Sequence, residues 1–221
     1  MLVFDVNETL LDLSALDAPF GEVFGDEAVR REWFAELLHQ AMTTTITGPY
    51  VDFAELGASA LDVVAQRRGQ TLSVDEQDRI LSAMTRLPPH DDAHPALQRL
   101  QEEGVRMVAL SNGPPNTLHA QLQSADLAGY FEQIFSADTA QRLKPAPEPY
   151  HMVADEMNVP IADLCLVAAH PWDTTGAIRA GAKAAFVARS GKHLSAVDPA
   201  PQVMGDTLED VAESLLAESP Q

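Results

Sequence analysis

The chain has 221 residues, of which 46% are hydrophobic, and it carries a formal net charge of −19 at pH 7. This length suits one folding unit with a large core, or one such unit with a smaller second one. A surface this acidic repels phosphate backbones and anionic lipid headgroups, so we expect neither nucleic acid nor a membrane surface as a partner.

The single cysteine, Cys165, lies in an apolar run and cannot form an internal disulfide. A buried thiol of this kind suits a reducing compartment. No apolar run approaches the roughly 20 residues of a membrane-spanning helix, and the N-terminus lacks the basic and apolar regions of a secretion signal. We therefore expect a cytoplasmic protein.

The chain opens with an apolar run at residues 1–4, which predicts a strand, and Asp5 follows it directly. A carboxylate is costly at the edge of a core, so Asp5 either caps a turn or reacts. Apolar side chains then follow helical spacing, with helices expected at 28–42 and 53–68. Because no strand pattern interrupts residues 12–88, we expect this stretch to be a helical insert that lies over the sheet as a lid.

From residue 90 onward, helices and strands alternate. Helices are expected at 93–103, 116–124, 147–157 and 174–180, and strands at 105–110, 133–136, 164–168 and 184–188. Strands this apolar are typical of a parallel sheet with both faces covered. The sequence therefore predicts a doubly wound α/β core domain with a mostly parallel sheet, built from residues 1–11 and 89–221, with a helical domain inserted at 12–88.

Polar residues follow several of these strands. In open α/β sheets, ligands bind at the carboxyl ends of the strands, so these residues form the candidate site. They are Asp5, Asn7 and Thr9 after the first strand, Ser111, Asn112 and Gly113 after the second, Lys144 after the third, and His170, Trp172 and Asp173 after the fourth. Two acids, one lysine and several neutral donors would meet at one edge of the sheet.

These residues form four ordered motifs. They are Phe4-Asp5-x-x-x-Thr9-Leu10, Leu110-Ser111-Asn112-Gly113, Lys144-Pro145 and Trp172-Asp173. In this order and over nearly the whole chain, they resemble the motifs of the haloacid dehalogenase superfamily. The resemblance implies that Asp5 is a nucleophile and that residues 12–88 are the helical cap domain which this superfamily inserts after its first motif.

Most members of that superfamily are phosphatases, which carry a second Asp two positions after the nucleophile and hold Mg²⁺ with acids of the last motif. In this chain the residue two positions after Asp5 is Asn7, which cannot exchange a proton as a carboxyl group does. In the last motif, Ala169 stands where such phosphatases commonly have the Asp that binds the metal. A hard cation needs several oxygen ligands. We therefore expect no metal ion and no other cofactor.

The pattern is more similar to the type II branch, the L-2-haloacid dehalogenases. The shared features are Lys144-Pro145 followed by Tyr150, Trp172-Asp173-x-Thr175-Gly176-Ala177, and the cap pattern Trp33…Tyr50-Val51-Asp52-Phe53. This resemblance implies that Asp5 displaces halide from the α-carbon of a small 2-halo carboxylate and forms an ester, which water then hydrolyses.

The resemblance also implies roles for the other residues. Lys144 would keep Asp5 ionised, and Asp173 would position Lys144 and the water. The expected catalytic residues are Asp5, Lys144, Asp173, Thr9 and Ser111. The expected substrate-binding or halide-binding residues are Asn112, Asn7, His170, Trp172, Tyr150, Phe34, Leu38 and Phe53. A homodimer is a further implication.

The chain departs from the type II pattern at several positions. Phe34 stands where that branch has an arginine that helps to bind the halide, and Arg30 and Arg31 lie about one turn earlier on the same predicted helix. Asn7 replaces an aromatic residue, and Ala168 and His170 stand where the branch has Ser and Asn. Without that arginine, either halide release is slow or the substrate differs.

Some assignments stay open at this point. His170 is a donor to the substrate, a general base in ester hydrolysis or a structural histidine. Trp172, Tyr150, Leu38 and Phe53 either line the pocket or pack in the core. For the whole protein, the alternatives to a dehalogenase are a phosphatase with an atypical acid and a catalytically idle binder of a small carboxylate or a protein.

Overall fold

A six-stranded sheet forms the centre of the molecule within residues 1–218, the part of the chain that this computed structural model describes. The strand order is β3-β2-β1-β4-β5-β6, and every neighbouring pair is parallel. The strands are β1 (Leu2–Phe4), β2 (Met107–Ser111), β3 (Gln133–Ser136), β4 (Cys165–Ala168), β5 (Lys183–Val187) and β6 (Val203–Gly205). The predicted doubly wound α/β fold is confirmed.

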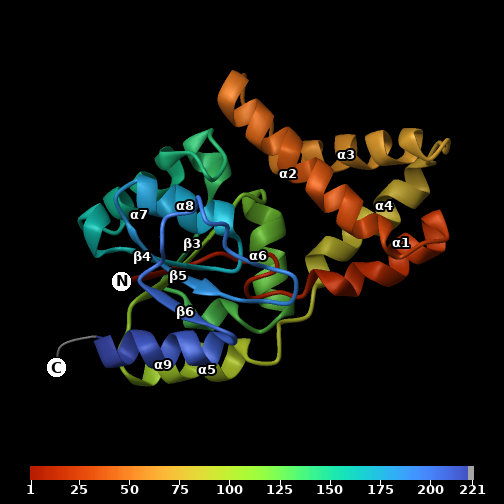
Figure 1. Ribbon diagram of the computed structural model, residues 1–221. Coiled ribbons are helices and arrows are strands. Elements are labelled where there is room, and N and C mark those ends of the chain that lie inside the picture. The colour runs from red at the N-terminus through yellow and green to blue at the C-terminus, as the bar shows by residue number, and fades with distance from the viewer. Residues whose placement is uncertain (219–221) are drawn as a thin grey trace.

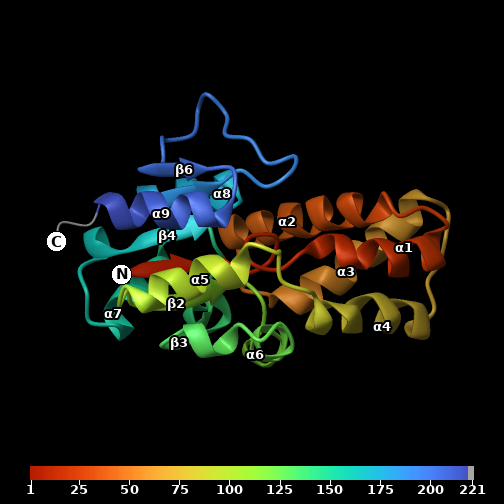
Figure 2. The same ribbon diagram turned by 90° about the horizontal axis from the view of Figure 1, so that it is seen from below.

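Helices cover both faces of this sheet (Figure 1). On one face, α5 and α9 lie side by side, and α7 and α8 lie on the other; Figure 2 shows the first face from below. The helices that accompany the sheet are α5 (Ala93–Glu102), α6 (Pro115–Ser124), α7 (Pro147–Glu156), α8 (Pro171–Arg179) and α9 (Leu208–Glu218). Two buried core layers result, one on each side of the strands.

The alternation of side chains along β1 shows how the two layers are built. Leu2 and Phe4 belong to the apolar cluster on the side of α5 and α9, whereas Val3 belongs to a second cluster that includes Tyr150 and Val153 of α7. Successive side chains of a strand point to opposite faces, so a strand that is covered on both sides must be apolar throughout. This requirement explains the uninterrupted apolar runs in the sequence.

Between β1 and β2 the chain forms a group of helices that lies to one side of the sheet (Figures 1 and 2). They are α1 (Asp17–Phe24), α2 (Val29–Thr47), α3 (Phe53–Arg67) and α4 (Val74–Ala83). Local signals fix their starts: the Asp52 carboxylate accepts hydrogen bonds from the backbone of Ala54 and Glu55, and Ser73 and Glu76 form a capping box. Such caps satisfy the free N–H groups of a first helical turn.

Short 3₁₀ helices complete the chain at Leu13–Leu16, Met84–Arg86, Ala128–Tyr130, Ala137–Ala140 and Ile161–Asp163. No helix within residues 1–218 combines the length and the apolar character needed to cross a membrane.

Helix α2 is longer than the sequence predicted, because it continues past Met42 to Thr47. Its last turns are rich in threonine, which usually disfavours a helix. Here the hydroxyl groups of Thr43 and Thr47 donate hydrogen bonds to the carbonyls one turn earlier, and the helix ends at Gly48. The prediction of an earlier end was wrong, since the helix includes these threonines and ends only at the glycine.

Other boundaries differ near the site. Strand β2 begins at Met107 rather than at residue 105, and α8 begins at Pro171 rather than at residue 174. Proline suits the first helical position, where no intrahelical N–H is needed. As a result, Trp172 and Asp173 lie in the first turn of α8 instead of in a loop.

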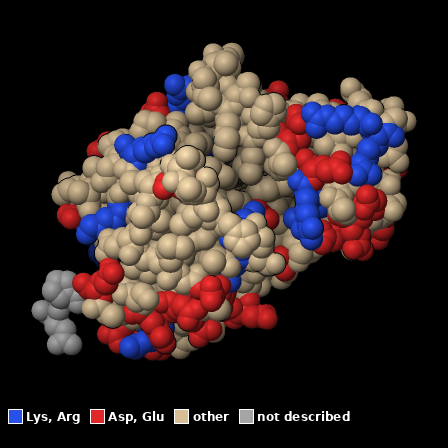
Figure 3. Space-filling model, in the orientation of Figure 1, with Lys and Arg blue, Asp and Glu red and all other residues tan. Residues whose placement is uncertain are grey.

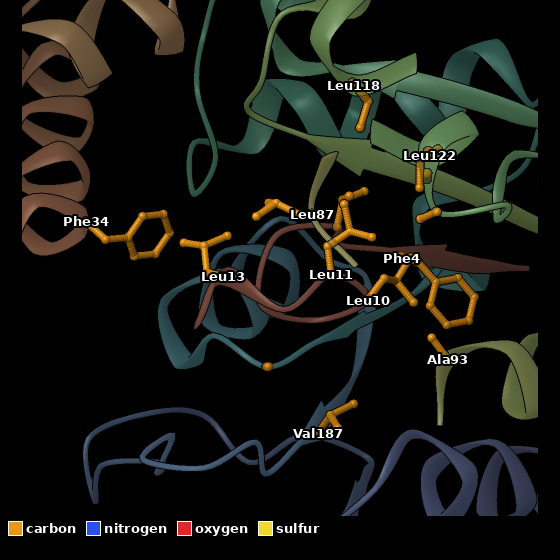
Figure 4. Close-up of a cluster of buried hydrophobic side chains, with 14 of the residues drawn as sticks. Phe4, Leu10, Leu11, Leu13, Phe34, Leu87, Ala93, Leu118, Leu122 and Val187 are labelled. Carbon is orange, nitrogen blue, oxygen red and sulfur yellow. The ribbon is translucent and has the colours of Figure 1, made fainter. Parts of the chain in front are cut away.

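A continuous apolar cluster joins the helices α1–α4 to the sheet. In the close-up of Figure 4, Phe34 extends from α2 toward Leu13, and the cluster continues past Leu11 to Phe4. The two chain segments that connect these parts also run together, since Asp12 N donates to Pro88 O at 2.8 Å. The division into residues 1–11 with 89–221 and residues 12–88 stays a prediction.

Candidate active site

The candidate site lies where the direction of winding reverses in the sheet. Strand β1 has β2 on one side and β4 on the other, so the connections leave it in opposite directions. Crevices that bind ligands form at the carboxyl ends of strands at such a switch point. Asp5 directly follows β1, Ser111 ends β2, and Asp173 lies in the first turn of the helix after β4.

Lys144 lies between two buried carboxylates. Its Nζ atom is 2.9 Å from Asp5 Oδ1, 2.6 Å from Asp173 Oδ2 and 3.0 Å from the carbonyl oxygen of Leu110. The exposed fractions are 4% for Asp5, 1% for Lys144 and 0% for Asp173. Charges this deeply buried are tolerated when each is paired and hydrogen-bonded, and here one ammonium uses its three hydrogens on three acceptors.

Burial and pairing set the protonation of this group. Burial raises the pKa of Asp5. The charge of Lys144, together with the hydrogen bonds that Asp5 accepts from Lys144 and Thr9, more than offsets this and lowers the pKa below its usual value. Burial also raises the pKa of Asp173, to about 6, because the charge of Lys144 offsets it only in part and Asp5 adds repulsion. Burial lowers the pKa of Lys144, yet both carboxylates more than compensate and the pKa is raised. Asp5 is thus an ionised carboxylate at neutral pH.

Neighbouring groups orient each member of this trio. The Thr9 hydroxyl donates to Asp5 Oδ2 at 2.6 Å and accepts from the Ala169 N–H at 2.9 Å. The side chain of Asn112 holds the backbone of Lys144 at both ends, since Lys144 N donates to Asn112 Oδ1 at 2.8 Å and Asn112 Nδ2 donates to Lys144 O at 3.2 Å. The lysine is therefore fixed at its backbone as well as at its ammonium.

The second carboxylate is fixed by Tyr150. The phenol of Tyr150 donates to Asp173 Oδ1 at 2.5 Å, so both oxygens of Asp173 are engaged. Gly176 permits this approach of α8 to the Lys144 segment, because a Cβ atom there would lie 2.6 Å from Cβ of Pro145 and 2.7 Å from the Tyr150 hydroxyl. Any larger residue at this position would collide with the segment that carries Lys144.

A small cavity of about 20 Å³ lies beside Asp5. Its walls are Asp5, Asn7, Phe34, Leu38, Phe53, Ser111, Asn112, Lys144, His170 and Trp172. The structure thus brings ten of the thirteen predicted site residues to one cavity, and Thr9, Tyr150 and Asp173 stand behind the wall, where they contact its members. Apolar residues from α2 and α3 face polar residues from the strand ends across it.

The other polar residues of the wall have partners of their own. Asn7 Oδ1 accepts from Gln121 Nε2 at 3.1 Å, and Ser111 Oγ accepts from the Gly113 N–H at 3.2 Å. The indole nitrogen of Trp172 is buried and makes no hydrogen bond within the described residues. A buried donor without an acceptor is rare in proteins, and here it belongs to a cavity wall.

His170 packs among aromatic side chains. Its ring centroid is 5.1 Å from that of Trp172 and 6.0 Å from that of Phe34. Its Nε2 atom lies 3.3 Å from the carbonyl oxygen of Asn7 and 3.4 Å from Glu8 Oε2. Burial lowers the pKa of His170 below its ordinary value, so the ring is neutral at pH 7.

A larger cavity of about 850 Å³ adjoins the small one and shares Phe34 and Leu38 with it. Arg30 and Arg31 line the larger cavity and not the smaller. Arg30 is also committed to Asp17 through an ion pair. In this arrangement neither arginine lines the small cavity, and Phe34 forms part of its wall.

Sequence reasoning did not single out Glu8 and Lys192, which form an ion pair of 2.6 Å on the wall of the larger cavity. Glu8 adopts a left-handed backbone conformation, with φ of 63°, which is uncommon for a residue other than glycine. Its place directly before Thr9 in the first motif was the available signal. No local pattern marks Lys192, which lies in the loop after β5.

The segment between β1 and α5 and the sheet part are also linked at two further contacts. The Tyr50 phenol donates to Asp138 Oδ1 at 2.6 Å, and Arg142 Nη1 donates to the carbonyl oxygen of Thr45 at 2.7 Å. Within residues 1–218, no group of three or more His, Cys, Asp or Glu side chains is arranged to hold a metal ion.

Comparison with known proteins places this site in a family. Residues 1–181 match the haloacid dehalogenase-like hydrolase family. (S)-2-haloacid dehalogenase 4A of Burkholderia cepacia is 31% identical over 191 residues, which are 86% of this chain and 83% of that protein. Haloacetate dehalogenase H-2 of Moraxella sp. (strain B) is 28% identical over 192 residues, 86% of each chain.

The fold agrees with a solved structure over almost the whole length. L-2-haloacid dehalogenase from Xanthobacter autotrophicus, solved with chloropropionic acid covalently bound, superposes with a TM-score of 0.92 at 23% identity, over 99% of this chain and 98% of that one. The motifs, the sheet topology and the matched length agree, and the chain belongs to the haloacid dehalogenase-like hydrolase family.

Proposed function

We propose that the protein is a hydrolytic dehalogenase of small 2-halo carboxylates, in which Asp5 attacks the α-carbon and forms an ester that water hydrolyses. The observation that carries this proposal is the position of the Lys144 ammonium, 2.9 Å from Asp5 and 2.6 Å from Asp173, beside a small cavity. The names of the curated relatives, which are 2-haloacid and haloacetate dehalogenases, support the substrate class.

In the first step, an oxygen of Asp5 displaces the halide from the α-carbon. The carbon–halogen bond breaks as the new carbon–oxygen bond forms. A carboxylate is a weak nucleophile in water, but the apolar walls of Phe34, Leu38 and Phe53 remove water from around it. Lys144 keeps the carboxylate ionised and fixes one of its oxygens, while Thr9 fixes the other.

Two further groups suit the two anions of the reaction. The Ser111 hydroxyl lies in the wall and is positioned for the substrate carboxylate. The unpaired indole N–H of Trp172 is positioned for the departing halide, together with the second amide hydrogen of Asn112. In this proposal these neutral donors partly replace the halide-binding arginine of the type II branch, at whose position this chain has Phe34.

Residues 12–88 act as a cap in this proposal. The cavity of about 20 Å³ is large enough for one or two water molecules, so substrate must enter before the cap closes. The contacts of Tyr50 with Asp138 and of Arg142 with Thr45 join the cap to the sheet part in the closed form. Opening at these contacts admits the substrate.

A halide-release screen tests the proposal. The purified protein is incubated with chloroacetate, bromoacetate, fluoroacetate and 2-chloropropionate, with and without a chelator, and free halide is measured. We expect halide release from at least the chloro and bromo acids, unchanged by chelator. The same preparations are tested with an aryl phosphate and Mg²⁺. Absence of halide release, together with phosphatase activity that needs Mg²⁺, would replace the proposal with the phosphatase alternative.

A further inference from the structure

His170 is the neutral titratable side chain in the wall of the small cavity. Among the wall residues, Asp5 is the nucleophile and Lys144 carries a proton. His170 is 4% exposed, and its ring is held between Phe34 and Trp172. Its position beside the nucleophile is therefore fixed by packing.

The two ring nitrogens of His170 have different surroundings. The Nε2 atom lies within 3.4 Å of two acceptors, the carbonyl oxygen of Asn7 and the carboxylate of Glu8. A nitrogen that faces two acceptors carries the hydrogen in the neutral ring. The Nδ1 atom then holds the lone pair, and it has no hydrogen-bond partner among residues 1–218. The imidazole thus has a free basic nitrogen.

Glu8 is itself held in place behind His170. Its Oε2 atom accepts from Lys192 Nζ at 2.6 Å, and its Oε1 atom lies 4.0 Å from Arg30 Nη1. The left-handed backbone conformation of Glu8, with φ of 63°, is maintained despite its cost. Strained backbone of this kind is often found where a side chain must be aimed at a functional group.

Asp173 is already engaged by other side chains. Its oxygens are engaged by Lys144 and Tyr150, and it is not part of the cavity wall. Once Asp5 is esterified, its own carboxylate is no longer available as a base. The proton acceptor for ester hydrolysis must therefore come from another residue of the wall.

We propose that His170 is the general base of ester hydrolysis, and that Glu8 and Lys192 are positioning residues that hold its ring and set its basicity. This inference rests on the proposed ester mechanism and extends it. It concerns His170 and Lys192, which are not among the residues that define the four motifs, and Glu8, which occupies an unspecified position of the first motif.

A water oxygen attacks Cγ of the Asp5 ester, and one water proton moves to His170 Nδ1. The tetrahedral intermediate collapses with cleavage of the bond between Cγ and the oxygen attached to the substrate's α-carbon. That alkoxide takes the proton back from His170 and leaves as the 2-hydroxy acid. The proton left on the new carboxyl group of Asp5 is released as Asp5 ionises beside Lys144.

Glu8 and His170 line different cavities. Glu8 and Lys192 both line the larger cavity of about 850 Å³, whereas His170 lines the small one, so the contact of His170 with Glu8 connects the two. In the space-filling view the surface is hollowed between the sheet part and the helices α1–α4, and basic side chains lie beside the hollow (Figure 3).

The first test separates ester formation from ester hydrolysis. His170→Gln and His170→Ala are mixed with excess bromoacetate, and halide and intact protein mass are measured after a denaturing quench. We expect a burst of about one halide per enzyme, a stable mass increase from the ester, and steady turnover lower by about 10²- to 10⁴-fold, the usual contribution of a general base. The halide burst itself shows that the variant is folded. His119→Gln, at an exposed histidine of α6, is the matched control and should leave turnover unchanged.

The second test uses the charges that face His170, which are Glu8, Lys192, Asp5 and Lys144. Glu8→Gln removes a negative charge that raises the pKa of His170, so the acid limb of ester hydrolysis should move to lower pH. Lys192→Met removes a positive charge that lowers this pKa, so the limb should move to higher pH. A structural role for the pair would not give shifts of opposite sign.

The outcomes distinguish this inference from the function on which it rests. If the unchanged protein releases no halide from any of the acids, the proposed function fails. If it does release halide, but His170→Gln hydrolyses the ester at the original rate or loses the burst in proportion to turnover, the general-base role is overturned. Shifts of the same sign in Glu8→Gln and Lys192→Met overturn the role of the pair.

Discussion

Lys144 Nζ lies 2.9 Å from Asp5 Oδ1, although the two residues are 139 positions apart in the chain. The same ammonium is 2.6 Å from Asp173, so one buried cation serves two buried carboxylates. Separation of charge in a dry interior is expensive, and this arrangement makes each of the three groups depend on the others.

Replacement of Lys144 by Met should destabilise the fold at pH 7 by about 3–5 kcal/mol, because two carboxylates stay buried without their cation. Both then bind a proton more readily in the folded chain than in the unfolded one, and protonation stabilises the fold. Lys144 lowers the pKa of Asp173, which is about 6 in its presence, so in the variant Asp173 binds its proton at a higher pH and the deficit should be smaller at pH 5 than at pH 7. Denaturant unfolding at pH 5 and pH 7 measures this. Lys183→Met, at an exposed lysine, is the control, and an equal deficit at both pH values would contradict the account.

Replacement of Tyr150 by Phe should move the acid limb of halide release to higher pH. The hydrogen bond from Tyr150 lowers the pKa of Asp173, which burial raises to about 6, so its loss lets that pKa rise further. Protonated Asp173 no longer holds the Lys144 ammonium as an ion pair. The rate of the halide burst is measured across pH, with Tyr130→Phe as control. An unmoved limb would show that Asp173 does not govern the first step.

Replacement of Leu38 by Ala should change chain-length preference. Leu38 lines the small cavity from α2, and its truncation makes room for roughly one or two more methylene groups. One methylene in an apolar pocket is worth about 1–3 kcal/mol of discrimination. We expect kcat/KM for 2-chlorobutyrate to rise relative to chloroacetate by about 10-fold or more. The control is Ile46→Ala, at an exposed position of the same helix, which should leave this ratio unchanged. An unchanged ratio in Leu38→Ala as well would show that the cavity is not the substrate site.

Replacement of Gly176 by Ala should lower both stability and turnover. The new methyl group would lie 2.8 Å from the carbonyl oxygen of Pro145, which is backbone and cannot easily move away. Overpacking of this kind costs about 1–3 kcal/mol. Because α8 also carries Asp173, its displacement should loosen the contact with Lys144. Thermal unfolding and steady-state kinetics check this, and a variant with full stability and activity would refute the close approach.

Most of the fold follows from local patterns. The apolar strands alternate with helices in the sequence, and the crossover connections of a parallel sheet require that alternation. Strand β6 was not predicted, because it has three residues, one of them the exposed Met204 at the sheet edge. Helices α1 and α4 were expected as part of a helical stretch without bounds, since their apolar spacing is short.

The polar residues that line the small cavity could be predicted from the sequence, because polar residues at the carboxyl ends of parallel strands meet at one edge of the sheet. The contacts that hold these residues in place could not be predicted. Nothing in the local sequence indicates that Asn112 holds the backbone of Lys144, or that Lys192 reaches Glu8 from 184 positions away. Such pairs depend on how distant loops pack together, and no periodic pattern encodes that.

The central claim is that Asp5 becomes covalently bonded to the substrate's carbon. It is tested most directly by a single turnover in water enriched in heavy oxygen with enzyme in excess over chloroacetate. When water attacks the ester at Cγ, the heavy oxygen enters Asp5 and not the first molecule of hydroxy acid. Mass spectrometry of the peptide that contains Asp5 should therefore show the label, and Asp5→Asn should reduce halide release on the order of 10⁶-fold. Unlabelled Asp5 with labelled product would mean that water attacks the substrate directly, and the account would be wrong.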